Sequence, residues 1–316
     1  MKAPLALVFP GQGSQYVGMA RDLLDQFSYT KTVFEEVSDA LKIDVAKLCL
    51  EGPEDRLQLT ANAQPSILTV SFAWYLVLKN ERGLEPIAAA GHSLGEYTAL
   101  LSAGALSLAQ AAGLVRRRGE LMQDAVPNGV GKMAAVIGLD DSAVRKLCES
   151  STQGTHSLVV AANFNAPGQV VIAGHAGAVE RAEISAGDNN SPYRARKVIP
   201  LKVSAPFHCP LMKPIAEEFR GGLESIEWKA TMFPVVANVH AKVHEREAMV
   251  DNLIQQLYSP VLWTQCVSTL TQLGCTTFLE PGPGKVLSGL VKRCAPNGSV
   301  VSVDTFDDFK RFGGEG

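Results

Sequence analysis

The sequence has few aromatic residues, no closely spaced cysteine pair and no long uninterrupted apolar run. Phe, Trp and Tyr make up 7% of the 316 residues, but apolar residues together reach 46%. That share is enough to bury a core and excludes a disordered chain. The 29 basic and 32 acidic residues nearly balance. Net charge therefore favours neither nucleic acid nor an anionic membrane surface, and we expect neither as a partner.

Cysteine spacing and the first residues bear on the compartment. The N-terminal run LALVF leads directly into Pro10-Gly11 without a small-residue cleavage site, so it predicts a first buried strand and not a signal peptide. The scattered cysteines predict reduced thiols in a cytoplasmic protein. They are Cys49, Cys148, Cys209, Cys266, Cys275 and Cys294.

Two stretches without a formal charge, residues 57–78 and 97–115, could suggest membrane spans. The first contains Pro65 and several amides, and the second contains Gly104 and Gln110. Each is too short in its apolar part or too polar to cross a bilayer. Both stretches predict helices buried inside a large α/β domain.

Apolar runs and turn signals predict an α/β fold with a discontinuous core. After residue 130 the pattern is β-α-β-β-α-β within about 70 residues, which is typical of a ferredoxin-like subdomain. We therefore predict a hydrolase-like core with a mostly parallel sheet in residues 1–130 and 204–316, and an inserted small subdomain in residues 131–203. The strands are expected at 5–9, 87–91, 133–139, 157–163, 169–174, 196–203, 233–239 and 276–282.

The segment IAAAGHSLGEYT, residues 87–98, contains the pattern G-x-S-x-G around Ser93. A buried strand precedes the pattern and a helix follows it, which is the context of a nucleophile elbow. Glycines are needed there because the sharp turn brings backbone close to the serine. The pattern and its context predict that Ser93 is a nucleophile; a glycine-rich turn with a capping serine is the alternative.

A serine hydroxyl needs a base, so one of the six histidines must lie beside Ser93. His208 follows the strand that returns the chain to the core, where catalytic loops of open sheets lie, and is favoured over His240. His92 is expected to point into the core. His240 and His244 have the H-x3-H spacing of a zinc pair, but no third ligand is evident, and we expect no metal. Cys209 is not expected to be the nucleophile, because adjacent side chains on an extended segment face opposite ways.

Three further segments are candidate site elements. Backbone N–H groups of Leu94 and of Gln12, in the loop PGQGSQ, could stabilise an oxyanion. Of three consecutive arginines at 116–118, one can point inward, and Arg118 is the candidate for binding a carboxylate, although spacing alone favours a solvated, salt-bridged arginine. The loop EPGPGK, residues 280–285, lacks the first glycine of a phosphate loop and predicts a strand-to-helix connection.

Taken together, these motifs resemble the malonyl-CoA:acyl carrier protein transacylases of bacterial-type fatty acid synthesis. The resemblance runs nearly end to end. It is carried by FPGQGSQ (9–15), AGHSLGEY (90–97), RRRGELMQ (116–123), NFNAPGQVVIAG (163–174), APFHC (205–209), QLYSPVLW (256–263) and EPGPGKVL (280–287).

The resemblance implies a ping-pong reaction in which Ser93, with His208 as base, takes the malonyl group from malonyl-CoA and passes it to the thiol of acyl carrier protein. It also implies an oxyanion hole at Gln12 and Leu94 and a carboxylate contact at Arg118. No acid could be assigned to orient His208, and the resemblance implies that a backbone carbonyl, matching Gln256, orients it instead. Asn165 and Phe207 are further expected pocket residues. No cofactor is implied, because the coenzyme A thioester is a substrate, and we expect a monomer.

Two other functions stay open at this point. A serine thioesterase on the same elbow normally has an acid and a late histidine, whereas here the histidine is central. A carrier-protein docking subunit would not need Ser93, His208 and Arg118 together. The sequence does not decide between two pathways, fatty acid synthesis and a standalone polyketide-type acyltransferase. It also offers two basic surfaces that could bind an acidic carrier protein, Lys292-Arg293 and residues 194–197.

Overall fold

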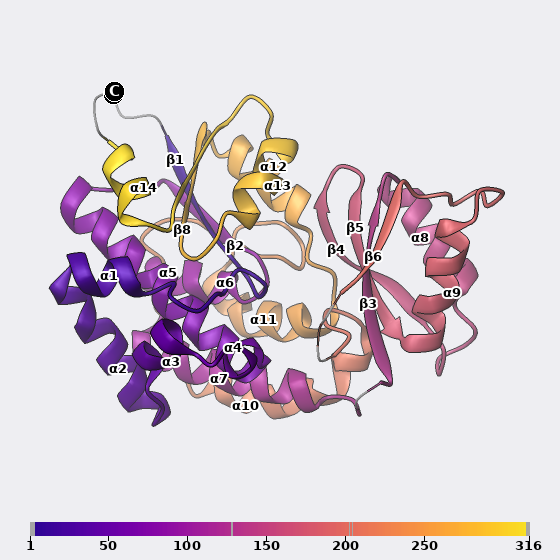
Figure 1. The fold of residues 1–316 in the computed structure, drawn as a ribbon, viewed down its shortest axis with the longest axis horizontal. Helices are drawn as coiled ribbons and strands as arrows, with labels where there is room; N and C mark the ends of the chain where they lie inside the picture. Colours follow the sequence, from indigo (N-terminus) through magenta and orange to yellow (C-terminus); the bar gives the residue numbers. More distant parts are fainter. Residues whose placement is uncertain (1–3, 128, 202, 204, 314–316) are drawn as a thin grey trace.

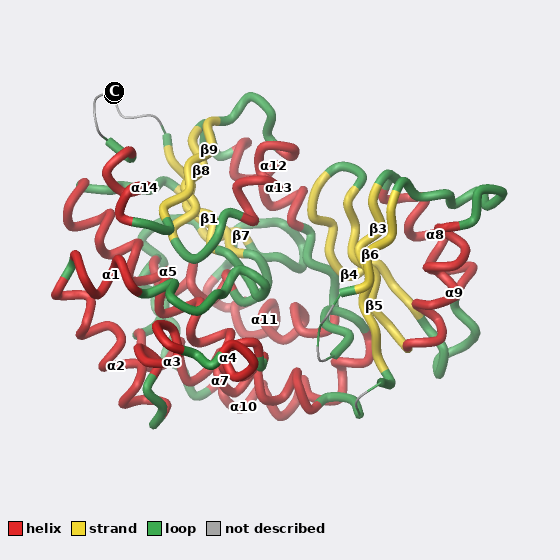
Figure 2. The backbone as a smooth tube through the Cα atoms, in the orientation of Figure 1, coloured by secondary structure: helices red, strands yellow, loops and turns green. Residues whose placement is uncertain are grey.

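Five parallel strands form the larger of two sheets in the computed structural model, which describes residues 4–127, 129–201, 203 and 205–313 (Figures 1 and 2). Ser204, where the sequence predicts the return to the core, lies outside these residues. The strand order is β7 (Val235–Val236), β2 (Ala88–Gly91), β1 (Leu5–Phe9), β8 (Thr277–Pro281) and β9 (Ser299–Val303). Parallel strands bring their carboxyl ends to one edge, where the loops after β1 and β2 meet.

Alternate side chains of β1 enter two different cores. Leu5, Leu7 and Phe9 pack into a core with α5 (Thr60–Arg82) and α7 (Leu108–Asp124). Ala6 and Val8 pack into a second core with α12 (Trp263–Gln272) and α13 (Val286–Cys294). Helices therefore cover both faces, which explains why the strand is apolar at every position.

The first charge-free stretch forms most of α5, which is buried as predicted. Within the described part of the chain, no helix combines the length and apolarity that crossing a membrane requires. The second stretch forms α6 (Gly95–Ser102) and the first half of α7. Further helices are α1 (Arg21–Gln26), α2 (Lys31–Leu41), α3 (Val45–Glu51), α4 (Glu54–Gln58), α10 (Ala216–Glu224), α11 (Met249–Tyr258) and α14 (Phe306–Arg311).

A four-stranded antiparallel sheet forms beside the larger sheet (Figure 1). Its inner face points toward the larger core through Met133 and Ala135, while Ala134 and Val136 pack against two helices on the outer face. The strand order is β4 (Val159–Ala166), β5 (Gln169–His175), β3 (Gly131–Ile137) and β6 (Lys197–Pro200), and the helices are α8 (Asp141–Ser151) and α9 (Ala176–Gly187). The predicted mixed α/β fold, with a mostly parallel sheet, is confirmed.

Some predicted boundaries differ from the observed ones. The strand expected at 233–239 pairs only over Val235–Val236, because the Ala237 N–H turns away to donate to the Lys242 carbonyl, at 2.9 Å. The segment before α10 is a 3-10 helix, Pro210–Ile215, that contains Pro214. A proline lacks the N–H that a regular helix needs, so the α-helix starts only at Ala216. Strand β9 was not predicted.

Candidate active site

A cavity of about 630 Å³ lies at the carboxyl edge of the parallel sheet. The loops after β1 and β2 contribute Gln12 and Ser93 to its wall, and α7 contributes Arg118. The antiparallel sheet closes the opposite side with Met133, Asn163, Asn165 and Val171. The two sheets thus enclose the site between them, as is usual for open α/β sheets.

The turn that carries Ser93 requires both glycines of the motif. A Cβ on Gly91 would lie 1.9 Å from the carbonyl carbon of Gly95, and a Cβ on Gly95 would lie 2.1 Å from the Phe9 oxygen. Ser93 itself has a φ of 53°, a left-handed conformation that non-glycine residues adopt rarely. The strand-turn-helix predicted from the sequence is therefore present, with Ser93 strained at its apex.

Replacing Gly95 by alanine is expected to lower the free energy of unfolding by roughly 3 kcal/mol, because the new methyl group would overlap backbone that cannot move independently. Gly113→Ala in α7 is the matched control, since nothing lies within 4 Å of its Cβ position. We expect that control to leave stability unchanged or slightly raised. Urea unfolding midpoints check both variants, and a Gly95→Ala protein as stable as wild type would contradict the prediction.

His208 lies directly beside Ser93. Its Nε2 is 2.7 Å from Ser93 Oγ, and its Nδ1 is 2.7 Å from the Gln256 carbonyl oxygen. A carbonyl only accepts, so Nδ1 carries the proton and Nε2 accepts the serine O–H. The structure thus brings together the predicted nucleophile, the predicted base and the carbonyl that orients the base.

Burial lowers the pKa of His208 to about 3, and the positive charge of Arg118 and the proximity of His92 act in the same direction. The hydrogen bond to the Gln256 carbonyl opposes them. The side chain is 3% exposed, which explains why desolvation is the largest cause. His208 is therefore neutral and able to accept a proton at ordinary pH.

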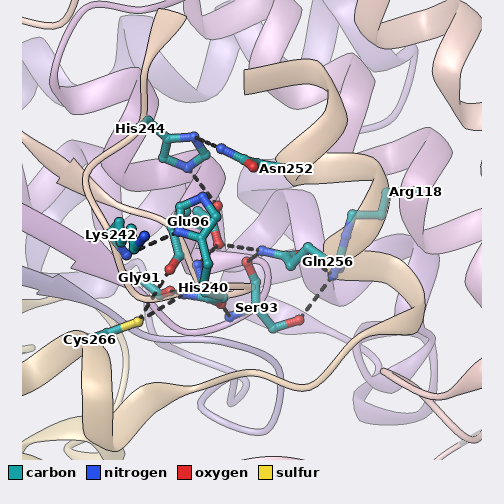
Figure 3. A network of polar contacts seen from close by, with 12 residues as sticks. Gly91, Ser93, Glu96, Arg118, His240, Lys242, His244, Asn252, Gln256 and Cys266 are labelled. Carbon is teal, nitrogen blue, oxygen red and sulfur yellow. Dashed lines mark hydrogen bonds and ion pairs between the residues drawn. The ribbon is translucent and has the colours of Figure 1, made fainter. Parts of the chain in front are cut away.

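Arg118 is a buried cation at the cavity wall. Its Nη2 donates to Ser93 Oγ at 3.0 Å and to Gln256 Oε1 at 2.8 Å (Figure 3). Its Nη1 donates to Gln64 Oε1 at 2.9 Å. Arg118 is 1% exposed, so the prediction of a solvated, salt-bridged arginine, which spacing alone favoured, is wrong. Among the residues that the structure describes, no carboxylate forms an ion pair with it. An arginine that is buried and bonded only to neutral oxygens can bind an incoming carboxylate.

The remaining predicted residues also line the cavity. Leu94 and Gln12 both reach its wall, and Gln12 Nε2 donates to Thr60 Oγ1 at 3.1 Å. Asn165 Oδ1 lies 2.8 Å from Nε2 of His92 at the cavity wall. The His92 ring also packs against the buried Trp263, with ring centroids 5.6 Å apart, so the prediction that it points into the core is met only in part. Phe207 lies beside His208 on the same wall.

The alternatives considered from the sequence do not meet at the cavity. His240 is exposed, and its Nδ1 accepts the Lys242 N–H at 3.1 Å. Cys209 Sγ donates to a backbone carbonyl, and burial raises its pKa to about 12. In the described ranges no group of three or more His, Cys, Asp or Glu side chains could hold a metal ion. The 280–285 loop joins β8 to α13, and Lys285 pairs with Asp308.

Sequence reasoning missed a set of buried polar residues behind Ser93. Glu96, in the first turn of α6, is fully buried and contacts Asn238, His244 and Gln256. Glu96 belongs to the motif AGHSLGEY, but its partners lie more than 140 residues away. One signal was available, because Glu96 is a charged residue directly before a long charge-free stretch.

A serine nucleophile with a histidine base, at a strained elbow beside a buried arginine, is an arrangement suited to covalent acyl transfer. The family model described as acyl transferase domain matches residues 6–303. The chain therefore belongs to the acyl transferase domain family and is an acyltransferase.

Within this family the chain is similar to malonyl CoA-acyl carrier protein transacylases. The protein of that name from Escherichia coli K12 is 47% identical over 289 residues, which cover 91% of this chain and 92% of the relative. The crystal structure of an acyl carrier protein S-malonyltransferase from Vibrio cholerae is 44% identical with a TM-score of 0.92, covering 98% of this chain and 100% of that one. A malonyl-transacylase in complex with a type II PKS acyl carrier protein is also 44% identical, with a TM-score of 0.92 and 97% of each chain covered.

Proposed function

We propose that the chain transfers the malonyl group of malonyl-CoA to the phosphopantetheine thiol of acyl carrier protein, and so supplies malonyl-ACP for fatty acid synthesis. The names of its relatives support the reaction. Arg118 is the observation that supports a carboxylated acyl group. It is a buried cation without an ion-pair partner among the described side chains, and its Nη2 lies 3.0 Å from Ser93 Oγ.

In the first half-reaction His208 Nε2 takes the Ser93 proton as Oγ attacks the thioester carbonyl of malonyl-CoA. Leu94 and Gln12 are proposed to donate backbone N–H groups to the resulting oxyanion. The tetrahedral intermediate collapses, the carbon-sulfur bond breaks, and the proton held by His208 passes to the coenzyme A thiolate. The Gln256 carbonyl stabilises the imidazolium that forms between these steps.

The second half-reaction repeats these steps with the carrier's thiol as nucleophile. His208 accepts the thiol proton, sulfur attacks the malonyl-Ser93 ester, and Ser93 Oγ leaves and recovers the proton. One cavity serves both substrates in turn, so the kinetics are ping-pong. Phe207 and Asn165 are proposed to shape the wall beside the acyl group.

Further properties belong to the proposal. We infer a hydrolase-like core in residues 1–130 and 204–316 with an inserted ferredoxin-like subdomain in residues 131–203. This division is supported by the strand order β4-β5-β3-β6 with helices after β3 and β5. We also propose that the enzyme acts as a monomer without a cofactor. A cytoplasmic location is supported by six free cysteines.

Intact mass spectrometry tests the reaction. Protein mixed with malonyl-CoA should gain one malonyl group on Ser93, and added acyl carrier protein should remove it and become malonylated. Free malonate without carrier labelling would instead indicate a thioesterase. No adduct at all would overturn an acyl-enzyme mechanism. Rates with a fatty acid carrier and with a type II PKS carrier, compared on the same protein, identify the pathway, because one of the similar structures holds a PKS carrier.

The rate of Ser93 modification should stay nearly constant as pH falls from 8 to 5. His208 must be neutral to act as base, and its pKa is lowered to about 3, so the neutral form persists well below the usual range of histidine. Arg118→Gln removes one cause of the lowered pKa and should move the acid limb to higher pH. The rate of Ser93 labelling by a neutral sulfonyl fluoride, measured as a function of pH, gives the position of the acid limb without a substrate carboxylate. An acid limb near pH 6.5 in the wild-type protein would contradict the prediction.

A further inference from the structure

Three hydrogen-bond donors converge on one buried carboxylate behind the nucleophile (Figure 3). Glu96 Oε2 accepts from the Asn238 backbone N–H at 2.9 Å and from Gln256 Nε2 at 2.7 Å. Its Oε1 lies 2.7 Å from Nε2 of His244. A carboxylate with no exposed surface and three donors is fixed in one orientation.

Two of these donors belong to residues that hold the reacting groups. Asn238 Oδ1 accepts the Ser93 N–H at 2.7 Å, and its Nδ2 donates to the Gly91 carbonyl at 2.8 Å. Asn238 therefore fastens the elbow on both sides of its apex. Gln256 Nε2 also donates to the Ser93 carbonyl at 3.0 Å, while its own carbonyl accepts from His208.

The side-chain amide of Gln256 also lies between two buried opposite charges. Its Oε1 accepts from Arg118, and its Nε2 donates to Glu96. The Asn252 amide nitrogen, 3.2 Å from Nδ1 of His244, donates there, so the proton of a neutral His244 lies on Nε2 and faces Glu96. Glu96 is thus the anion that offsets Arg118 through one amide group. Burial lowers the pKa of Arg118, and the contact with Tyr97 and the negative charge of Glu96 oppose that effect.

We propose that Glu96 is a positioning residue for acyl transfer, and that it acts through Asn238 on the elbow and through Gln256 on His208 and Arg118. This inference rests on the proposed function. Glu96 touches neither substrate nor Ser93 Oγ. Its charge orients the Gln256 amide so that the oxygen faces Arg118 and the backbone carbonyl stays aligned with His208.

The test is a double-mutant cycle of Glu96→Gln and Gln256→Ala. The measured quantity is the single-turnover rate of Ser93 malonylation. Glu96→Gln places an N–H group among donors and should slow malonylation about 10- to 100-fold, whereas in the Gln256→Ala background its effect should be at least about 5-fold smaller. Labelling by neutral phenylmethylsulfonyl fluoride should slow as well, because the elbow and base are disturbed independently of the substrate carboxylate. Equal effects in both backgrounds would show a merely structural role and overturn the proposal.

Glu280→Gln is the matched control, because Glu280 is also fully buried and accepts two backbone N–H groups, from Leu287 and Ser288. It should lose stability but keep the malonylation rate within about twofold.

If Glu96→Gln does not fold, the proposal is tested with His244→Leu and His244→Gln instead. The leucine variant should be slow and the glutamine variant, which keeps a donor, near wild type, and equal rates overturn the proposal. A wild-type protein that forms no adduct overturns the proposed function itself and this inference with it.

Discussion

Replacing Ser93 by alanine is expected to lower the malonyl transfer rate by at least ~10⁴-fold while leaving the fold intact. Ser93 Oγ contacts only His208 Nε2 and Arg118 Nη2 among the described side chains. Both partners have other hydrogen bonds that survive the change, to Gln256 and Gln64. The hydroxyl therefore contributes to the chemistry far more than to stability.

Ser102→Ala is the control for this prediction. Ser102 is the last residue of α6, the helix that follows the Ser93 turn, and its buried hydroxyl has no hydrogen-bond partner in the described structure. Its loss should change neither the unfolding midpoint nor the transfer rate. Intact mass after exposure to malonyl-CoA tests whether Ser93 is the nucleophile, since the Ser93→Ala protein should carry no adduct. An adduct that forms at the wild-type rate would place the nucleophile elsewhere.

The elbow was predictable from sequence because its geometry is local. Strand, turn and helix follow within about fifteen residues, and Gly91 and Gly95 are required by backbone that lies close to them. The strand apolar at every position predicted a covered sheet for the same reason. Strand β9 has a partly exposed pattern and is an edge strand, so its sequence gives a weaker signal.

The environment of Arg118 and Glu96 was not predictable in the same way. Three arginines in a row must point in three directions, but the sequence does not say which direction is inward. Arg116 and Arg117 form ion pairs with Glu120 and Glu218 on the surface, whereas Arg118 turns into the site. The partners of a buried group come from distant segments, and no local spacing encodes them.

The sequence was equally unable to show the partners of His244. Its spacing from His240 imitates a zinc pair, yet its two ring nitrogens contact Glu96 and Asn252. A motif of two residues does not distinguish a metal ligand from a buried hydrogen-bonding histidine. The third and fourth partners decide between them, and these are set by the tertiary fold.

Replacing Arg118 by alanine is expected to slow malonyl transfer about 10²- to 10³-fold more than acetyl transfer. The malonyl carboxylate would enter a buried site without its cation, and truncating one partner of a buried charge pair costs about 2–5 kcal/mol. Acetyl transfer loses no such partner. It should change less, although Arg118 also contacts Ser93 Oγ and affects the pKa of His208.

The ratio of the two rates is therefore the decisive quantity, because effects on Ser93 and His208 divide out of it. Arg117→Ala is the matched control. Arg117 is the preceding residue on α7, and it is half exposed and paired with Glu218 and Glu120. Exposed pairs contribute only about 0–1 kcal/mol, so neither rate should change by more than a few-fold. Initial rates of adduct formation from malonyl-CoA and acetyl-CoA measure the ratio. Equal losses for both acyl groups in Arg118→Ala would mean that Arg118 supports Ser93 alone and that the carboxylate is bound elsewhere.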